Sequence, residues 1–162
     1  MASTLTIFPV GNGDMSLIKL GDDFTLLIDC NLKDATTDNC PVLMVDDLFE
    51  MLPRDESKRP YVDVFMITHP DQDHCQGAEK YLHFGKPDAY VDKPKDGERK
   101  KIFVRELWSS PLTFRRFKKK RKKNENCETL CSDGKAIWAE ARRRVAAYKE
   151  ANKAGKANSN KD

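Results

Sequence analysis

An apolar run that ends in a cluster of histidines and aspartates constrains this chain more than any other feature. Residues 62–67, Val-Asp-Val-Phe-Met-Ile, have the composition of a buried β-strand. His69, Asp71, Asp73 and His74 follow directly after it, within six residues of one another. Residues i and i+2 of an extended segment point to the same side, so His69 and Asp71 can converge on one cation. Asp73 and His74, at the turn into the next helix, can approach a second position nearby.

These four side chains carry the donor atoms of a metal site. Imidazole nitrogens and carboxylate oxygens suit Zn²⁺, and they also suit Mn²⁺ or Fe²⁺. Two such ions held close together could share a hydroxide that is active at neutral pH. The alternative is an ordinary solvated turn between a strand and a helix, in which Asp73 only caps the helix. Four ligands directly after a buried strand favour the metal site.

The remaining pattern predicts an α/β protein. Three short apolar runs separated by tight turns predict an antiparallel meander, and they cover Leu5–Val10, Met15–Leu20 and Phe24–Asp29. Helical spacing predicts three helices, which are Val42–Leu52, Asp73 to Leu82 or His83, and Asp133–Tyr148. Two further short strands are expected, at Ala89–Val91 and Ile102–Val104.

The five cysteines do not predict a disulfide framework, because their number is odd and their spacing is irregular. Cys127 and Cys131 have no second pair and no histidine near them in the sequence, so a structural role is favoured over metal binding. Neither a secretory signal nor an apolar stretch of the ~20 residues that a membrane span needs is present. We therefore expect a soluble protein of the reducing cytoplasm, without membrane contact.

The loop His69-Pro70-Asp71-Gln72-Asp73-His74 resembles the His-x-His-x-Asp-His signature of the metallo-β-lactamase superfamily, with Asp71 in the place of the second histidine. The form His-Pro-Asp-x-Asp-His is common in the ComEC-type hydrolase branch of that superfamily. The segment Phe8–Met15 is similar to the opening hairpin of that branch, and Asp29 matches the aspartate that the family keeps beside its metal loop. Asn31 stands where the family usually has glycine, and asparagine also tolerates positive φ.

The resemblance covers about residues 5–92 and implies a metallo-β-lactamase-like αββα sandwich, of which this chain would hold only the N-terminal half. It implies that His69 and Asp71 bind a first ion and that Asp73 and His74 bind a second. Asp73 would also orient the attacking water, which makes it the catalytic residue. The family takes further ligands from later strands. The remaining histidine, His83, is expected to be a surface or core residue rather than a ligand.

The charge is divided between two parts of the chain. Residues 1–100 hold 11 Lys and Arg and 19 Asp and Glu, whereas residues 101–162 hold 18 and 7. Together with the resemblance, this division predicts three parts. They are the N-terminal half of the hydrolase domain at residues 1–108, a basic helical insertion at 109–150 and a disordered tail at 151–162.

The basic insertion is a candidate nucleic-acid contact. Two phenylalanines interleave with its charge, as in proteins that bind single strands. The alternative is a solvated loop whose charge balances the acidic part of the chain. The basic residues that would contact phosphates are Arg115, Arg116, Lys118, Lys119, Lys120, Arg121, Lys122 and Lys123.

The sequence therefore predicts a metal-dependent hydrolase that attacks a phosphoester or a carboxyl-type ester, with a small molecule or a nucleic acid as substrate. Asp71 in place of a histidine makes the ligand set richer in oxygen, which favours harder ions and phosphoester chemistry. The alternative is an incomplete, inactive domain that binds nucleic acid or a protein partner through its basic segment.

Overall fold

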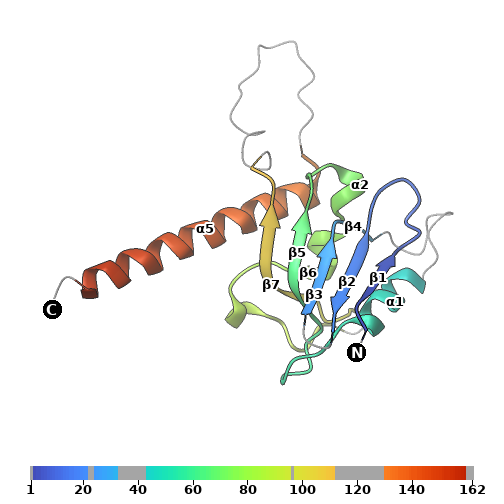
Figure 1. The fold of residues 1–162 in the computed structure, drawn as a ribbon, viewed down its shortest axis with the longest axis horizontal. Coiled ribbons are helices and arrows are strands. Elements are labelled where there is room, and N and C mark those ends of the chain that lie inside the picture. The colour runs from blue at the N-terminus through green and yellow to red at the C-terminus, as the bar shows by residue number, and fades with distance from the viewer. Residues whose placement is uncertain (1, 22–23, 33–42, 96, 112–129, 160–162) are drawn as a thin grey trace, which may run out of the picture.

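The computed structural model of the chain describes residues 2–21, 24–32, 43–95, 97–111 and 130–159. These residues form an α/β protein with a six-stranded mixed sheet and four α-helices (Figure 1). The sheet contains β1 (Thr4–Ile7), β2 (Ser16–Leu20), β3 (Phe24–Ile28), β5 (Tyr61–Ile67), β6 (Leu82–His83) and β7 (Ile102–Ser109). The other elements are the two-residue strand β4 (Cys30–Asn31), the helices α1 (Leu43–Met51), α2 (Gln72–Cys75), α3 (Ala78–Tyr81) and α5 (Ser132–Ser159), and the 3-10 helix η1 (Pro87–Ala89).

The order of the strands across the sheet is β1-β2-β3-β5-β7-β6. The first three strands pair antiparallel, which confirms the predicted meander. β5 joins β3 in parallel, β7 joins β5 in parallel, and β6 adds a short parallel pair to β7. Because β3 and β5 run in the same direction, the residues that follow them lie next to each other at one edge of the sheet.

One face of the sheet is covered by helices. The register places Leu17, Leu27 and Phe65 side by side on this face, and each is at most 1% exposed. They belong to one buried cluster with the apolar side of α1, which contributes Met44, Val45, Leu48 and Phe49, and with Leu52 directly after it. Both α1 and α5 lie behind the sheet in Figure 1. Removing this apolar area from water is the main stabilising contribution to the fold.

The opposite face of the sheet is apolar and partly open. Ile7, Ile28, Met66 and Trp108 lie in one row across it, by the register of four strand pairs. Ile7 is 72% exposed and Trp108 is 49% exposed, whereas Val64 at the centre of the face is buried. No described helix lies over this face in Figure 1. Apolar side chains thus occupy both faces of the sheet, and only one face is covered within the described residues.

The helix predicted from Asp73 to Leu82 or His83 is wrong as a single element. The chain instead forms α2 and α3, which are separated by Gly77 with φ 82°. A Cβ at Gly77 would collide with the carbonyl oxygen of Leu32, because Cys75 and Gln76 form isolated bridges with β4. Pairing with a distant strand therefore interrupts the local helical preference.

Two further expectations differ from the structure. The strand predicted at Ala89–Val91 is wrong, because Ala89 ends η1 and the next two residues belong to neither a helix nor a strand. The last helix continues to Ser159, past the predicted end at Tyr148, so the segment expected to be a disordered tail from Ala151 begins inside α5. Alanine and lysine extend an existing helix at little cost in free energy.

Other expectations are confirmed or fall outside the described residues. The helix predicted at Val42–Leu52 is α1, and the strand predicted at Ile102–Val104 is the beginning of β7. The basic segment 114–123 and Cys127 lie outside the described residues. None of the described helices has both the length and the apolar character that crossing a membrane requires.

Candidate metal centre

The four predicted ligands lie at the carboxyl edge of the sheet, where β5 ends and α2 begins. Asp71 is the N-cap residue of α2, and its side chain makes no capping hydrogen bond. Asp73 lies in the first turn of that helix and is therefore not its N-cap residue. The segment 68–74, here called the metal loop, is held between the end of a buried strand and a helix one turn long.

The structure brings the four side chains of the metal loop together in pairs. The ring centroids of His69 and His74 are 3.8 Å apart. Nε2 of His69 lies 3.6 Å from Oδ2 of Asp71, and Nε2 of His74 lies 3.7 Å from Oδ2 of Asp73. Two ligands about 2.1 Å from one tetrahedral ion are about 3.4 Å apart. Each pair therefore has nearly the spacing that one ion requires, and the donor atoms suit Zn²⁺.

The fit to a complete site is partial. Within the described residues, no group of three or more His, Cys, Asp or Glu side chains is arranged to enclose an ion. Each imidazole–carboxylate pair thus offers two candidate ligands.

One buried carboxylate, Asp29, holds both imidazoles. Asp29 directly follows β3 and is 2% exposed, and its Oδ1 accepts a hydrogen bond of 2.7 Å from the backbone N–H of Thr68. Its Oδ2 accepts one of 2.6 Å from the Thr68 hydroxyl and one of 3.0 Å from Nδ1 of His74. Oγ1 of Thr68 lies 3.0 Å from Nδ1 of His69. Since the hydroxyl donates its one proton to Asp29, its oxygen accepts from the Nδ1–H of His69.

This network assigns the same tautomer to both rings. In the neutral form of each ring the proton is on Nδ1, and Nε2 has the lone pair that a metal ion requires. In that form the lone pairs of His69 and His74 are on the nitrogens that face Asp71 and Asp73. A carboxylate that accepts the N–H of a metal-binding imidazole fixes the ring and raises its basicity. Asp29 is placed to do so directly for His74 and through Thr68 for His69.

The backbone at Asp29 is strained. Its φ of 54° lies in the left-handed region, which is uncommon for a residue other than glycine. Its N–H donates to the carbonyl of Met66 at 2.8 Å, so both its main chain and its side chain are tied to the end of β5. Strain of this kind persists where the surrounding contacts over-determine the backbone, and such positions are frequent at functional sites.

The turn between β1 and β2 packs directly against the metal loop. Gly13 has φ 135°, and a Cβ at this position would collide with the carbonyl oxygen of Asp73 and the side-chain amide of Asn31. Only glycine allows this approach. The same turn brings Oδ2 of Asp14 to 3.7 Å from Nδ1 of His74. Asp14 is thus a further carboxylate of the site.

Two thiols lie beneath the metal loop. Cys30 and Cys75 are fully buried, and burial raises the pKa of both thiols. Both side chains pack in the core beneath the loop.

His83 takes no part in this site. It belongs to β6, is 8% exposed, and its Nε2 lies 3.0 Å from the carbonyl oxygen of Lys86. Its ring stacks on Phe103 at 5.8 Å between centroids. The prediction that His83 is a surface or core residue is confirmed.

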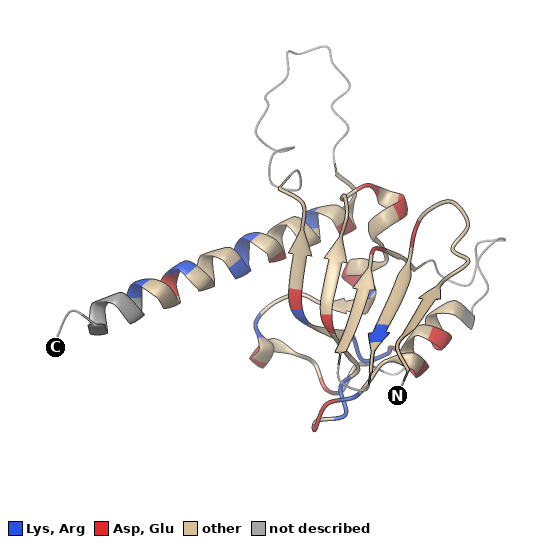
Figure 2. Cartoon of the chain, viewed as in Figure 1, with Lys and Arg blue, Asp and Glu red and all other residues tan. Residues whose placement is uncertain are grey.

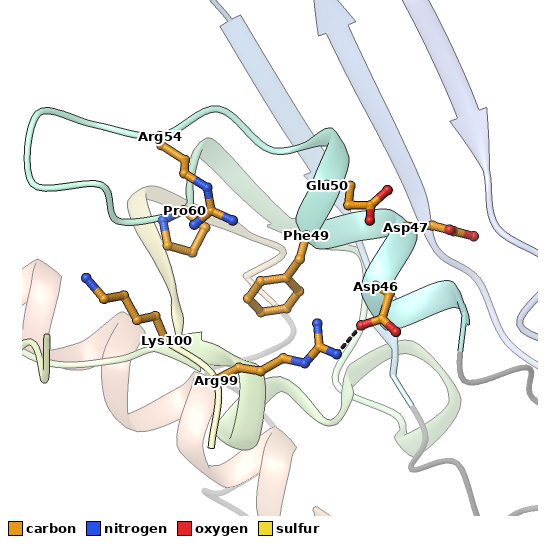
Figure 3. Close-up of a pocket in the computed structure, with 8 residues that line it drawn as sticks. All are labelled: Asp46, Asp47, Phe49, Glu50, Arg54, Pro60, Arg99 and Lys100. Atoms are coloured by element: carbon orange, nitrogen blue, oxygen red, sulfur yellow. Dashed lines mark ion pairs between the residues drawn. The ribbon is translucent and has the colours of Figure 1, made fainter. Parts of the chain in front are cut away.

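A separate pocket of about 470 Å³ opens at the other end of the sheet, between α1 and the segments that precede β5 and β7 (Figure 3). Its lining residues are Asp46, Asp47, Phe49, Glu50, Arg54, Pro60, Arg99 and Lys100. Arg99 forms an ion pair with Asp46 across it and lies over the ring of Phe49. The pocket carries both signs of charge and no imidazole, so the metal loop remains the site of the candidate ligands.

Thr68 and Asp14 are the members of the site that sequence reasoning missed. Thr68 is the first residue after β5, and a hydroxyl at that position can reach the residue that follows the neighbouring parallel strand. Asp14 ends a Gly-Asn-Gly-Asp turn, which the sequence marks as a hairpin without indicating what the hairpin contacts. The basic residues of segment 115–123 lie outside the described residues, so the structure does not place them relative to the site.

No family model matches the chain, and neither a curated protein nor a solved structure matches it.

Proposed function

We propose that this chain belongs to a metal-dependent hydrolase of the metallo-β-lactamase type that acts on a phosphoester or ester bond. The observation that supports the proposal is the Asp29 network, which engages Nδ1 of both His69 and His74 and leaves Nε2 of each ring next to a carboxylate. A solvated turn has no need of a buried, strained carboxylate that orients two imidazoles.

We assign the residues of the site to metal binding, water activation and positioning of the ligands. His69, Asp71, Asp73 and His74 would hold one or two ions of Zn²⁺, Mn²⁺ or Fe²⁺, and a bound ion would supply a nucleophilic hydroxide at neutral pH. Asp73 is 43% exposed on its side chain, so it can reach a water molecule and accept its proton. Asp29 and Thr68 would hold the rings in place, and Asp14 adds negative charge beside His74.

The uncovered apolar face of the sheet supports the proposed αββα sandwich. An αββα sandwich needs a second sheet against the inner face of the first. The row of Ile7, Ile28, Met66 and Trp108 is the kind of apolar surface on which such a sheet packs. A second layer placed there would stand beside the metal loop and could contribute the further ligands.

The proposal is tested by hydrolysis of a phosphodiester and a carboxylic ester with added Zn²⁺ or Mn²⁺. Activity should require the metal and should be lost in His69→Ala and Asp73→Ala. Asp88→Asn, in an exposed acid of η1, should leave it unchanged. Activity that persists without metal, or in both ligand variants, would contradict the proposal.

The basic segment supports a second candidate function. Arg115, Arg116, Lys118, Lys119, Lys120, Arg121, Lys122 and Lys123 would contact the phosphates of a nucleic acid. Salt-sensitive binding to single-stranded DNA that survives His69→Ala and Asp73→Ala, with no hydrolysis, would favour a binding protein over an enzyme.

A further inference from the structure

Two cysteines far apart in the sequence meet beside the metal loop. Cys75, in α2, and Cys131, directly before α5, are 56 positions apart in the chain, and their Sγ atoms are 3.4 Å apart. Cys75 is fully buried, whereas Cys131 is partly exposed. A disulfide has a sulfur–sulfur distance of about 2.05 Å, so the two atoms need to approach by about 1.4 Å.

The elements that carry the two sulfurs are fixed to each other by contacts that do not involve the thiols. The Asp133 carboxylate, in the first turn of α5, accepts hydrogen bonds from the backbone N–H groups of Gly77 at 3.1 Å and Glu79 at 2.8 Å. A Cβ added to Gly134 would lie 2.9 Å from the carbonyl oxygen of Pro70, so the first turn of α5 touches the metal loop itself. The position of one sulfur opposite the other is thus set by independent packing.

The surroundings of Cys131 suit a reacting sulfur. Its Sγ accepts a hydrogen bond of 3.3 Å from the backbone N–H of Gly134, at the beginning of a long helix. Because Cys131 is also the more exposed of the two, an external oxidant meets it first.

We propose that Cys75 and Cys131 form a reversible thiol–disulfide switch that ties the first turn of α5 to the metal loop. The oxidant is a low-molecular-weight disulfide. The Cys131 sulfur, after losing its proton to solvent, attacks that disulfide, breaks its sulfur–sulfur bond and releases one thiolate, which takes up a proton. The Cys75 sulfur then attacks Cys131 in the mixed disulfide, and the second small thiol leaves with the Cys75 proton. Two protein thiols are oxidised and one small disulfide is reduced to two thiols.

The switch does not depend on the proposed hydrolase activity. Closure would restrain α2, which contains two of the four candidate ligands, and α5, which packs against the edge of β7 through Arg144. Under reducing conditions the pair stays open. Cys30, the third thiol nearby, is fully buried in β4.

The test is peptide mapping by mass spectrometry of the full chain after incubation with oxidised glutathione, without reduction. The expected product is a single linked pair of peptides that contains Cys75 and Cys131, and that disappears after addition of dithiothreitol. Cys127→Ser should still form this link, and Cys131→Ser should not. A link between Cys127 and Cys131, a glutathione adduct that persists on Cys131, or no oxidation of either residue would overturn the proposal.

Thermal unfolding gives a second readout on the same samples. A disulfide that closes a loop of this length should raise the Tm of the oxidised chain by about 10 °C over the reduced chain. Cys127→Ser should show the same rise, and Cys131→Ser should show none. Equal Tm values for the oxidised and reduced forms of the unaltered chain would contradict a link between α2 and α5.

Discussion

The two ends of the sheet use charge in different ways. At the carboxyl ends of β3 and β5, carboxylates pair with imidazoles, as Asp71 does with His69 and Asp29 does with His74. Around the amino ends of β5 and β7, carboxylates pair with guanidinium groups, as in Arg59–Asp55 and Arg105–Asp63. Figure 2 shows acidic residues around the metal loop and both signs of charge at the opposite end.

The two ends therefore have different roles: the end with the imidazoles is the candidate site, and the end with the guanidinium groups stabilises the fold. A guanidinium stays charged at every physiological pH and has no lone pair to give, so its pairs with carboxylates are structural. An imidazole that is held as a neutral tautomer can change its partner from a carboxylate to a metal ion. The pocket of Figure 3 lies at the end rich in guanidinium groups, and its shape alone does not make it reactive.

Asp29→Ala, at the carboxyl ends of β3 and β5, is expected to have the largest effect on stability and on Zn²⁺ affinity. The change leaves the donors of Thr68 and His74 unsatisfied and places alanine at φ 54°, so we expect a loss of about 3 kcal/mol of unfolding free energy. Zn²⁺ affinity should fall about 10- to 100-fold. Urea denaturation and metal titration measure the two effects.

Asp29→Asn is the matched control, because asparagine tolerates the left-handed backbone and keeps one oxygen acceptor. It should recover most of the stability and little of the metal affinity. If both variants bind Zn²⁺ as the unaltered chain does, Asp29 does not orient the ligands.

Gly13→Ala should destabilise the chain by about 2 kcal/mol, because the new Cβ meets the backbone of Asp73 at a positive φ. Gly11→Ala also has a positive φ, of 74°, but its Cβ would meet open space. It should cost about 1 kcal/mol. Chemical denaturation compares the two variants. Equal losses of unfolding free energy would show that the turn at Gly13 does not pack against the metal loop.

Glu140→Gln tests whether the ion pairs of Glu140 with arginines stabilise the fold, through the pH dependence of the unfolding free energy. Glu140 is 3% exposed. Burial would raise its pKa, but hydrogen bonds from Arg143 and Arg144 together with their charges lower it below the ordinary 4.5. Its contribution is therefore complete above about pH 4.5 and is lost as the pH falls through the lower, folded value. We expect the variant to lose on the order of 1–2 kcal/mol at neutral pH.

The pH dependence of the unfolding free energy below neutral pH distinguishes this change from a general loss of stability. Arg144 also donates to the carbonyls of Val104 and Arg105, so Glu140 holds the group that joins α5 to β7. Unfolding free energy measured from about pH 6 to pH 3 should fall less steeply in Glu140→Gln than in the unaltered chain. Parallel curves would contradict a lowered pKa of Glu140.

Arg59→Ala should have the smallest effect. It removes a part-exposed ion pair with Asp55 and the stacking of a guanidinium over Tyr90 and Phe103, which together contribute about 1 kcal/mol. Zn²⁺ affinity should not change. A fall in metal affinity as large as that of Asp29→Ala would mean that the two ends of the sheet are coupled.

Much of this organisation is visible in the sequence, because it is local. The alternation and turns of residues 5–29 predict the meander, and the strand that ends at Ile67 predicts where the ligands emerge. The parts that the sequence did not reveal depend on distant contacts. The break at Gly77 follows from pairing with β4, and the meeting of Cys75 with Cys131 follows from the docking of α5. The role of Thr68 required knowing that β3 lies beside β5.

The central claim is that His69 and His74 hold a cation through Nε2 while Nδ1 stays protonated. The chain has three histidines, so ¹⁵N-edited NMR of the imidazoles during titration with Zn²⁺ observes each ring. Both Nε2 resonances of the metal loop should shift together, both Nδ1–H signals should remain, and the resonances of His83 should stay in place. Shifts of all three rings alike, or of none, would contradict a metal centre at this loop.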